Sequence, residues 1–316
     1  MVEGIHLSLM IGPAIPVPVG RDVVDALTRV RITQTTEGPG GFQLTFTLSK
    51  GSPLETLFLV TSGASIPIVR VVLVATVRGT PEVLMDGVMT NHEVSPGESG
   101  GSSTLTVTGE DLSKVMDLIA LDGLPFPGMP DVARVALMLA KYAVLGVIPL
   151  VIPSILLDVP NPLQRIPGQR GTDLAYIRQL AEQVGYVFYV DPGPAPGTST
   201  AYWGPEIKVG PPQPALNVDM DAHRNVESLT FSYDAQSAEL PILMIHNQET
   251  KATIPIPVPD VTPLNPPLGA IPPIPQKLTP IRTGRRSPVQ AAAIGLARAA
   301  KRLFPRPYPL AMGRGM

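Results

Sequence analysis

The sequence predicts a mainly β fold with α insertions (α+β class), and three features carry this prediction. Residues 42–48 alternate strictly between apolar and polar side chains, which is the period of a strand with one buried face. Residues 68–77, IVRVVLVATV, form a β-branched run interrupted only by Arg70, as in a strand buried along most of its length. Two helical segments, at residues 132–145 and 173–184, lie between groups of strands.

The composition indicates that much apolar surface must be hidden from water. Of 316 residues 38 are proline and only 16% are charged, against roughly 5% and 25% in ordinary proteins. The mean hydropathy is +0.21. Because large exposed apolar patches are rare on soluble monomers, this surface lies either inside a compact fold or between subunits. We expect burial between subunits, because proline-rich chains with long loops pack their own interiors less completely.

Residues 1–112 are expected to form a first β-domain. After the run at 68–77, a Gly/Pro turn leads into a second strand over residues 83–94. The loop SPGESGGSS then precedes a short alternating strand at residues 104–108. Several strands at short spacing, separated by Gly/Pro turns, favour a barrel or a sandwich.

Residues 113–166 are expected to form a helical, apolar insertion. Asp131 is placed to cap a helix over residues 132–145. The uncharged stretch 142–157 is 16 residues long, short of the ~20 that a membrane-spanning helix needs, and two prolines would break such a helix. We therefore expect the insertion to pack against the β-domain or against a neighbouring subunit.

Residues 167–250 are expected to form a second domain that begins with a helix. Thr172 is a favourable N-cap, Asp173 suits the positive end of the helix, and Gly185 can end it. An aromatic strand follows at residues 186–190 and ends in the turn DPGPAPG. Further strands are predicted at residues 200–209, 226–233 and 242–246.

The C-terminal part is predicted to be a proline-rich arm over residues 251–286 and a basic helix and tail over residues 287–316. Prolines are so dense in residues 253–280 that we expect an extended or polyproline-like arm, neither sheet nor helix. From Lys277 onward the chain has nine basic and no acidic residues. Such a tail docks on an acidic surface, faces a polyanion, or is a solvated helix.

Residue types that usually carry chemistry are scarce. The chain has no cysteine, which excludes disulfides, thiolate metal sites and cysteine nucleophiles and fits a reducing cytoplasm. The sequence has no GxSxG, GxGxxG or GxxxxGK[ST] motif. The four histidines are scattered without the spacing of a metal site: His6, His92, His223 and His246.

The remaining candidates each have a structural interpretation beside a functional one. The carboxylate pairs Glu110-Asp111 and Asp219/Asp221 are typical of helix starts and turns, although paired carboxylates can also do acid–base work. The aromatic pair Tyr202-Trp203 could stack on a sugar or a base, but a packing role is more common. We therefore predict no catalytic, cofactor-binding or metal site, and no enzyme activity.

One stretch carries a family resemblance. Residues 171–203, GTDLAYIRQLAEQVGYVFYVDPGPAPGTSTAYW, resemble the signature helix and strand of the phage late control protein D family. That family includes tail baseplate hubs and the hub portion of the valine-glycine repeat spike proteins of type VI secretion. Residues 84–97, 105–117 and 225–229 resemble other family segments, in the right order.

The resemblance implies a homotrimeric baseplate hub. Each subunit would have two related β-barrel domains, and six barrels would form a pseudo-sixfold ring. That ring would join the hexameric inner tail tube protein to a trimeric spike and contact baseplate wedge proteins, within a phage-tail-like particle assembled in the cytoplasm. No cofactor, specific nucleic-acid recognition or stable membrane insertion is implied.

Two departures from the family pattern shape these expectations. No valine-glycine-rich spike domain follows in this sequence, so the spike would be a separate chain. The sequence reaches PLAMGRGM where family members continue into closing strands of the second barrel. Two alternatives to the hub remain open: a tail-associated cell-wall hydrolase, and a translocation factor that inserts residues 132–157 into a membrane.

Overall fold

The structure is a computed structural model that shows two compact units. One unit comprises residues 1–181 and 187–204, and the other comprises residues 182–186 and 205–316. The described residues are 6–13, 15–34, 38–49, 52, 54, 68–77, 79–97, 102–154, 159–163, 166–206, 217, 228–230, 239–246, 253–257, 277–282 and 310–312.

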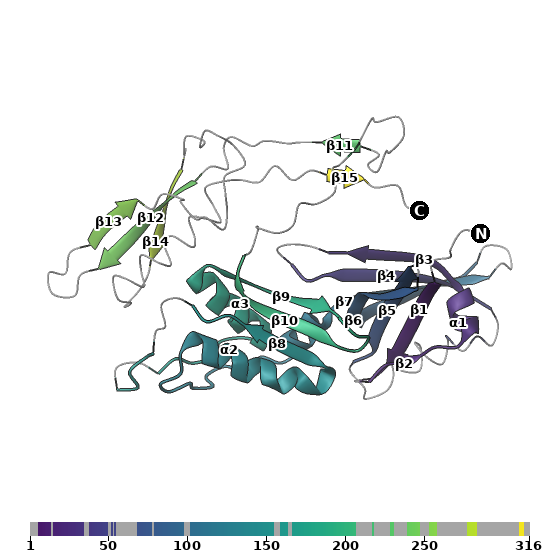
Figure 1. Ribbon diagram of the computed structural model, residues 1–316, viewed down its shortest axis with the longest axis horizontal. Coiled ribbons are helices and arrows are strands. Elements are labelled where there is room, and N and C mark those ends of the chain that lie inside the picture. The colour runs from purple at the N-terminus through teal and green to yellow at the C-terminus, as the bar shows by residue number, and fades with distance from the viewer. Residues whose placement is uncertain are drawn as a thin grey trace. The chain divides into compact units, whose positions relative to one another are not determined.

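A seven-stranded antiparallel sheet dominates the first unit (Figure 1). The strands lie in the order β2-β1-β5-β6-β7-β4-β3, with a short helix, α1 (Arg21–Asp25), before β3. Their bounds are β1 His6–Gly12, β2 Val17–Pro18, β3 Leu27–Thr33, β4 Gly41–Leu48, β5 Arg70–Val77, β6 Thr80–Ser95 and β7 Ser103–Asp111. The prediction of a mainly β fold is confirmed.

The two strongest sequence patterns correspond to the observed burial. Along β4 the side chains of Phe42, Leu44, Phe46 and Leu48 are buried, and the residues between them are half-buried. Residues 70–75 of β5 are buried without interruption, because this strand lies inside the sheet between β1 and β6. The core of the sheet is formed by the inward side chains of β1, β4, β5 and β7.

Strands β6 and β7 are longer than the sequence patterns indicated. β6 contains a register shift between Met89 and Asn91, so one continuous alternation cannot run through its 16 residues. β7 extends to Asp111 because it pairs with β4 on one side and with β6 on the other. Pairing on both sides satisfies the backbone of polar residues that no apolar periodicity marks.

Close packing between β6 and β7 requires glycine. A Cβ on Gly87 would lie 2.3 Å from the carbonyl oxygen of Glu110 and 3.2 Å from the ring of Phe42. Phe42 also contacts Gly109, where a Cβ would lie 2.3 Å from the ring. The two glycines let the Phe42 ring lie directly on the backbone of the paired strands.

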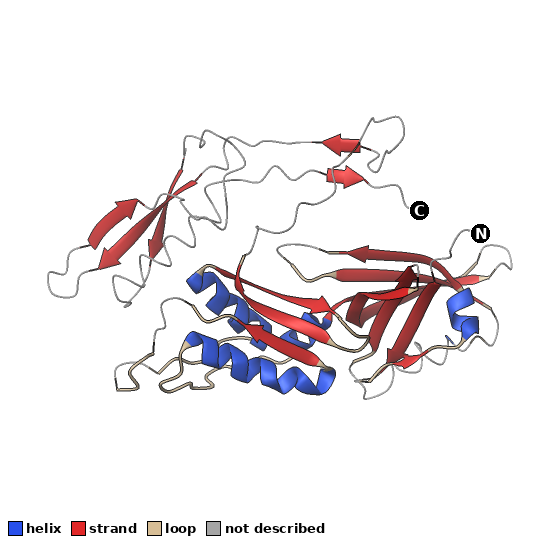
Figure 2. Ribbon diagram, in the orientation of Figure 1, coloured by secondary structure: helices blue, strands red, loops and turns tan. Residues whose placement is uncertain are grey.

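The rest of the first unit is a layer of helices and three strands (Figure 2). The strands lie in the order β8-β10-β9. The elements are the 3-10 helix η3 Leu112–Asp117, α2 Asp131–Ala140, the 3-10 helix η4 Lys141–Leu145, β8 Val147–Val151, α3 Asp173–Val184, β9 Tyr186–Pro192 and β10 Ser199–Pro205.

The helix expected at 173–184 is confirmed with its cap. The amide of Ala175 donates to the hydroxyl of Thr172 at 3.2 Å, and Gly185, at φ +72°, ends the helix in the left-handed conformation. The other helix differs from expectation. Asp131 is its first residue instead of its cap, and the α-helix ends at Ala140, beyond which the chain continues as η4.

Strand β8 joins the expected insertion to the strands that follow α3. It pairs parallel with β10, from Val147 opposite Ser199 to Val151 opposite Trp203. Residues 147–151 and 199–203 therefore share one sheet, although about fifty residues of sequence separate them. Domain boundaries near residues 112, 166 and 250 stay a prediction.

The second unit contains strands β11 Ser228–Thr230, β12 Glu239–His246, β13 Thr253–Pro257, β14 Lys277–Arg282 and β15 Leu310–Met312. β12 pairs antiparallel with β13 and parallel with β14, and β11 pairs antiparallel with β15. A closed second barrel stays a prediction. The expected helix beyond Ser287 lies outside the described residues.

The expectation that residues 253–280 form no sheet is wrong at both ends of that range. β13 and β14 are the edge strands of a three-stranded sheet, and both contain proline. Pro255 and Pro257 occupy alternate positions of β13. Alternate backbone nitrogens of an edge strand point away from its neighbour, so a proline there removes no ladder hydrogen bond.

Candidate interaction surface

The sequence-predicted catalytic candidates in the first unit have structural roles. Asp111 caps η3 by accepting a hydrogen bond from the amide of Ser113 at 2.9 Å, and it also accepts from the amide of Gly40. Glu110 lies 3.7 Å from the ammonium of Lys114. The helix-start interpretation is therefore confirmed for Asp111. Asp219 and Asp221 lie outside the described residues.

The aromatic pair and the histidines do not converge on a site. Trp203 and Tyr202 are buried, and the Tyr202 ring stacks on Tyr189 at a centroid distance of 5.0 Å. His6 lies on β1, His92 on β6 and His246 on β12, and His223 lies outside the described residues. Among the residues that the structure describes, no group of three or more His, Cys, Asp or Glu could hold a metal ion.

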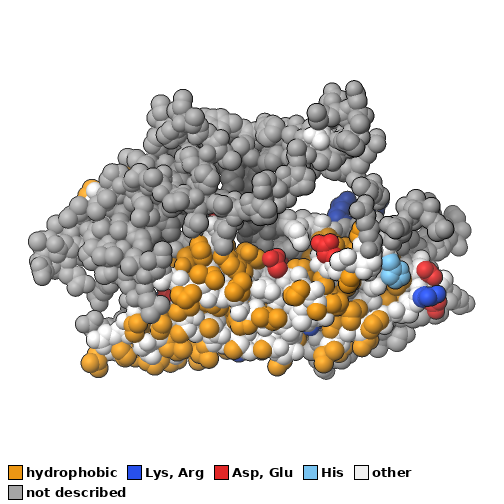
Figure 3. All heavy atoms as spheres, in the orientation of Figure 1, with side chains coloured by type: hydrophobic (Ala, Val, Ile, Leu, Met, Phe, Trp, Pro, Cys, Tyr) orange, Lys and Arg blue, Asp and Glu red, His pale blue; other side chains and the backbone are white. Residues whose placement is uncertain are grey.

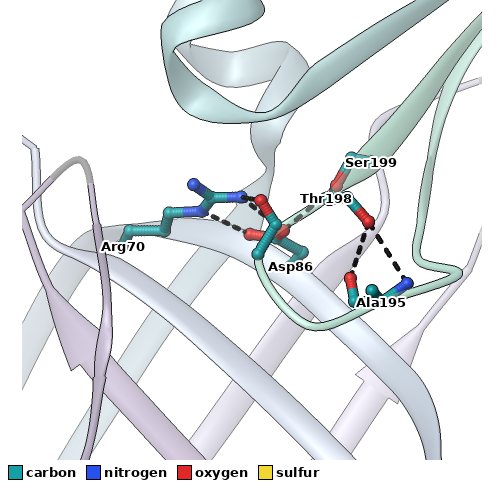
Figure 4. A network of polar contacts seen from close by, with 6 residues as sticks. Arg70, Asp86, Ala195, Thr198 and Ser199 are labelled. Atoms are coloured by element: carbon teal, nitrogen blue, oxygen red, sulfur yellow. Dashed lines mark hydrogen bonds and ion pairs between the residues drawn. The ribbon is translucent and has the colours of Figure 1, made fainter.

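A buried ion pair connects the seven-stranded sheet to the hairpin of β9 and β10 (Figure 4). The guanidinium of Arg70 on β5 donates to both carboxylate oxygens of Asp86 on β6, at 2.7 and 2.6 Å. The same guanidinium donates to the carbonyl of Gly197 at 2.9 Å, and the hydroxyl of Ser199 donates to Asp86 at 3.1 Å. Arg70 and Asp86 side chains are only 3% and 0% exposed.

The sequence contains a signal for this ion pair. Arg70 is the single charged residue in the run at 68–77, and an isolated charge in a buried strand requires a buried partner. Asp86, its partner, lies on the adjacent strand, where Arg70 is opposite Val88 and Asp86 is opposite Val72. The register that pairs them is a tertiary feature.

Two further polar clusters hold the helical layer together. Asp173, at the start of α3, accepts hydrogen bonds from Tyr142 at 2.7 Å and Gln169 at 2.7 Å, and its carboxylate lies 2.5 Å from the ammonium of Lys141. Burial, followed by the hydrogen bond to Asp173, raises the pKa of Tyr142, so its hydroxyl remains a donor. Arg134 on α2 bonds Asp131 and the hydroxyl of Tyr176 on α3.

Exposed apolar side chains concentrate in one part of this layer. Of the sixteen large hydrophobic side chains exposed among the described residues, eleven lie between residues 118 and 166. Figure 3 shows hydrophobic side chains gathered over the side of the first unit that carries α2 and β8. We call the exposed apolar side chains of residues 118–166 the insertion surface.

The first part of the insertion surface is an irregular ribbon. Residues 120–126 run antiparallel to residues 167–172 through bridges at Ala120–Thr172 and Pro125–Gly168. Backbone hydrogen bonds of 2.8–3.0 Å join the two segments. The exposed side chains here are those of Leu118, Ile119, Leu121 and Leu124.

The remaining members of the insertion surface lie on α2, η4, β8 and the residues after β8. Leu137 on α2 is 51% exposed and Val144 on η4 is 79% exposed, whereas Val135, Met138 and Leu139 on α2 are buried. The other exposed members are Ile148 and Leu150 on β8, and Val159, Leu163 and Ile166 beyond it. The helix therefore presents apolar residues both to the core and to the outside.

Charge is nearly absent from the insertion surface. The described charged residues between 118 and 163 are Asp122, Asp131, Arg134 and Lys141. Asp131 and Arg134 are buried together, Lys141 pairs with Asp173, and Asp122 accepts a hydrogen bond from the amide of Gly171 at 2.7 Å. No helix among the described residues is long and apolar enough to cross a membrane.

No family model and no curated protein matches this chain. Solved structures do match it. The tail protein of Neisseria meningitidis MC58 is similar over 94% of this chain and 75% of its own length, with a TM-score of 0.57 and 15% identity. The lidded Francisella PdpA-VgrG complex is similar over 88% of this chain and 40% of the matched chain, with a TM-score of 0.52 and 8% identity.

A further match is the lidless form of the PdpA-VgrG complex, with a TM-score of 0.53, 8% identity, and coverage of 90% of this chain and 51% of the matched one. This chain therefore spans about half or less of the PdpA-VgrG chains that it matches. At such identities the likeness is one of fold. The resemblance to tail and spike proteins that the sequence motifs indicated is confirmed at that level.

Proposed function

We propose that this chain is a structural baseplate hub subunit of a contractile tail or a related injection system. Three copies form a ring that joins a hexameric inner tail tube to a trimeric spike, with baseplate wedge proteins around it. The observation that carries the proposal is the fold shared with the tail protein of Neisseria meningitidis MC58 over 94% of this chain. The order of the motifs along the sequence supports the same assignment.

The contacts of the buried charged residues suit a scaffold. Each of these side chains bonds a residue of another element or the start of a helix: Arg70, Asp86, Asp111, Arg134 and Asp173. Asp131 pairs with Arg134 within α2. Such contacts hold a subunit in one shape, which a ring built from repeated contacts requires. In the ring, the seven-stranded sheet would supply the first barrel and residues 167–250 the second, giving six barrels in three copies.

The test is the mass and shape of the full chain in solution. Three copies of a 33.5 kDa chain have a mass of about 100 kDa. We expect this mass in analytical ultracentrifugation, and ring-shaped particles with sixfold modulation by electron microscopy. A chain that stays monomeric at every concentration, alone and with the tube and spike proteins of its own particle, would contradict the proposal.

A further inference from the structure

We infer that the insertion surface is where one copy of this chain packs against the next. The inference rests on the proposed function and deepens it, because it assigns the contact between copies to particular residues. It starts from the distribution of charge. Of the four described charged side chains between 118 and 163, Asp131 and Arg134 are buried against each other, Lys141 pairs with Asp173, and Asp122 accepts a hydrogen bond from the amide of Gly171, so little charge is offered to an oppositely charged partner.

The size of the surface favours a permanent contact. The eleven exposed side chains range from 40% to 94% exposed. Summed over these side chains, the exposed area is on the order of 1,000 Å². A standard interface takes ~800 Å² from each partner, so this surface is large enough for a stable contact.

The apolar composition of the insertion surface favours a second copy of this chain as its partner. Interfaces between transient partners are about as polar as the rest of a protein surface, whereas permanent interfaces are more apolar and poor in charge. A surface of this kind must be covered from the time the chain folds. The partner that is always present at that time is another copy of the same chain.

The backbone of β8 indicates how the contact is made. The amide of Ser199 donates to the carbonyl of Gly146, and the amide of Ile152 donates to the carbonyl of Trp203. Even-numbered residues of this strand therefore direct their backbone groups to β10, and odd-numbered residues direct theirs to the open edge. Pro149, at the centre of that edge, has no amide to offer.

Strand addition to β8 is therefore interrupted at its middle. Ile148 and Leu150 flank this proline, with 50% and 47% of their surface exposed. The contact between copies is accordingly made by packing of apolar side chains and does not extend the sheet.

The absence of cysteine allows a direct test on the full chain. Val144→Cys and Leu163→Cys place single thiols at the two most exposed positions of the insertion surface. Ser95→Cys, at the exposed end of β6, is the matched control. The rate of maleimide labelling of each variant is measured on the assembled protein, whose mass is checked before labelling.

We expect Val144→Cys and Leu163→Cys to label at least tenfold more slowly than Ser95→Cys in the oligomer. Adding Leu137→Asp should dissociate the oligomer and bring all three rates together, while circular dichroism shows an unchanged fold. If Leu137→Asp unfolds the chain, dilution of the single-cysteine variants below the dissociation concentration serves as the second comparison.

The outcomes separate this inference from the proposed function. An oligomer of about 100 kDa in which all three thiols label equally fast overturns the inference and leaves the hub proposal standing. A chain that never oligomerises overturns both. A monomer that floats with phosphatidylcholine vesicles, and that loses flotation with Leu137→Asp, shows that the surface meets lipid instead and also overturns the inference.

Discussion

Removing one partner of the Arg70–Asp86 ion pair should destabilise the protein strongly. Asp86→Ala deletes the two hydrogen bonds from the guanidinium and the one from Ser199. It also leaves the Arg70 guanidinium, whose side chain is only 3% exposed, without its carboxylate partner, although the carbonyl of Gly197 still accepts a hydrogen bond from it. Breaking a buried pair in this way costs ~3–5 kcal/mol, a large fraction of the ~5–15 kcal/mol that stabilises a typical domain.

The exposed pair Glu110–Lys114 provides the control. Its partners are about one-third exposed and 3.7 Å apart, so Lys114→Ala should cost less than ~1 kcal/mol. The double variant Arg70→Met/Asp86→Leu removes both charges, and we expect it to recover much of the loss caused by Asp86→Ala.

Urea unfolding followed by circular dichroism measures all three variants on the same protein. The midpoint should fall sharply for Asp86→Ala, little for Lys114→Ala, and by an intermediate amount for the double variant. The reasoning is refuted if Asp86→Ala is as mild as Lys114→Ala, or if the double variant is less stable than Asp86→Ala alone.

Three further predictions concern single side chains. Gly87→Ala should cost ~1–3 kcal/mol of stability, since its Cβ would lie 2.3 Å from a backbone oxygen of β7. Gly41→Ala should cost much less, because the nearest atom to its Cβ lies 3.5 Å away. Thermal unfolding of both variants checks this. Asp173→Ala should cost ~3 kcal/mol of stability, because three donors lose their acceptor. Thr172→Ala should cost only ~1 kcal/mol, because it removes the helix cap alone. Equal urea midpoints for the two variants would contradict this. Burial, and then the charge of Asp111, raise the pKa of Asp191, so its ionised form destabilises the fold above that pKa. Asp191→Asn should therefore raise the melting temperature at pH 7 and have little effect at pH 3, where the wild-type carboxyl is protonated in both states; a gain that is the same at both pH values would argue against this cause.

Sequence patterns predicted the structure correctly where the interactions are between near neighbours in the chain. The alternation at 42–48 marks one face of a strand, and the observed burial of β4 follows it residue by residue. Thr172 and Gly185 mark the two ends of α3, because an N-cap hydroxyl and a left-handed glycine act on the adjacent turn alone. The helix-start interpretation of Asp111 succeeded for the same reason.

Proline illustrates the limit of such patterns. Its missing amide donor is a local property, and it led us to exclude sheet from residues 253–280. Whether that donor is needed depends on which side of the strand faces a neighbour, and β13 and β14 are both edge strands. That property belongs to the sheet and cannot be read from the strand alone.

The sequence by itself determined the mainly β class and the capped helix at 173–184, because each rests on residue spacing within one segment. The likeness to tail proteins came from the resemblance of several segments to those of a known family, in the same order. The tertiary structure decided which distant segments meet. It placed Asp86 against Arg70, paired β8 with β10, and left eleven large apolar side chains of residues 118–166 exposed among the described residues. These outcomes depend on strand register and on burial by the whole unit. Both are set by packing between segments, which no single segment encodes.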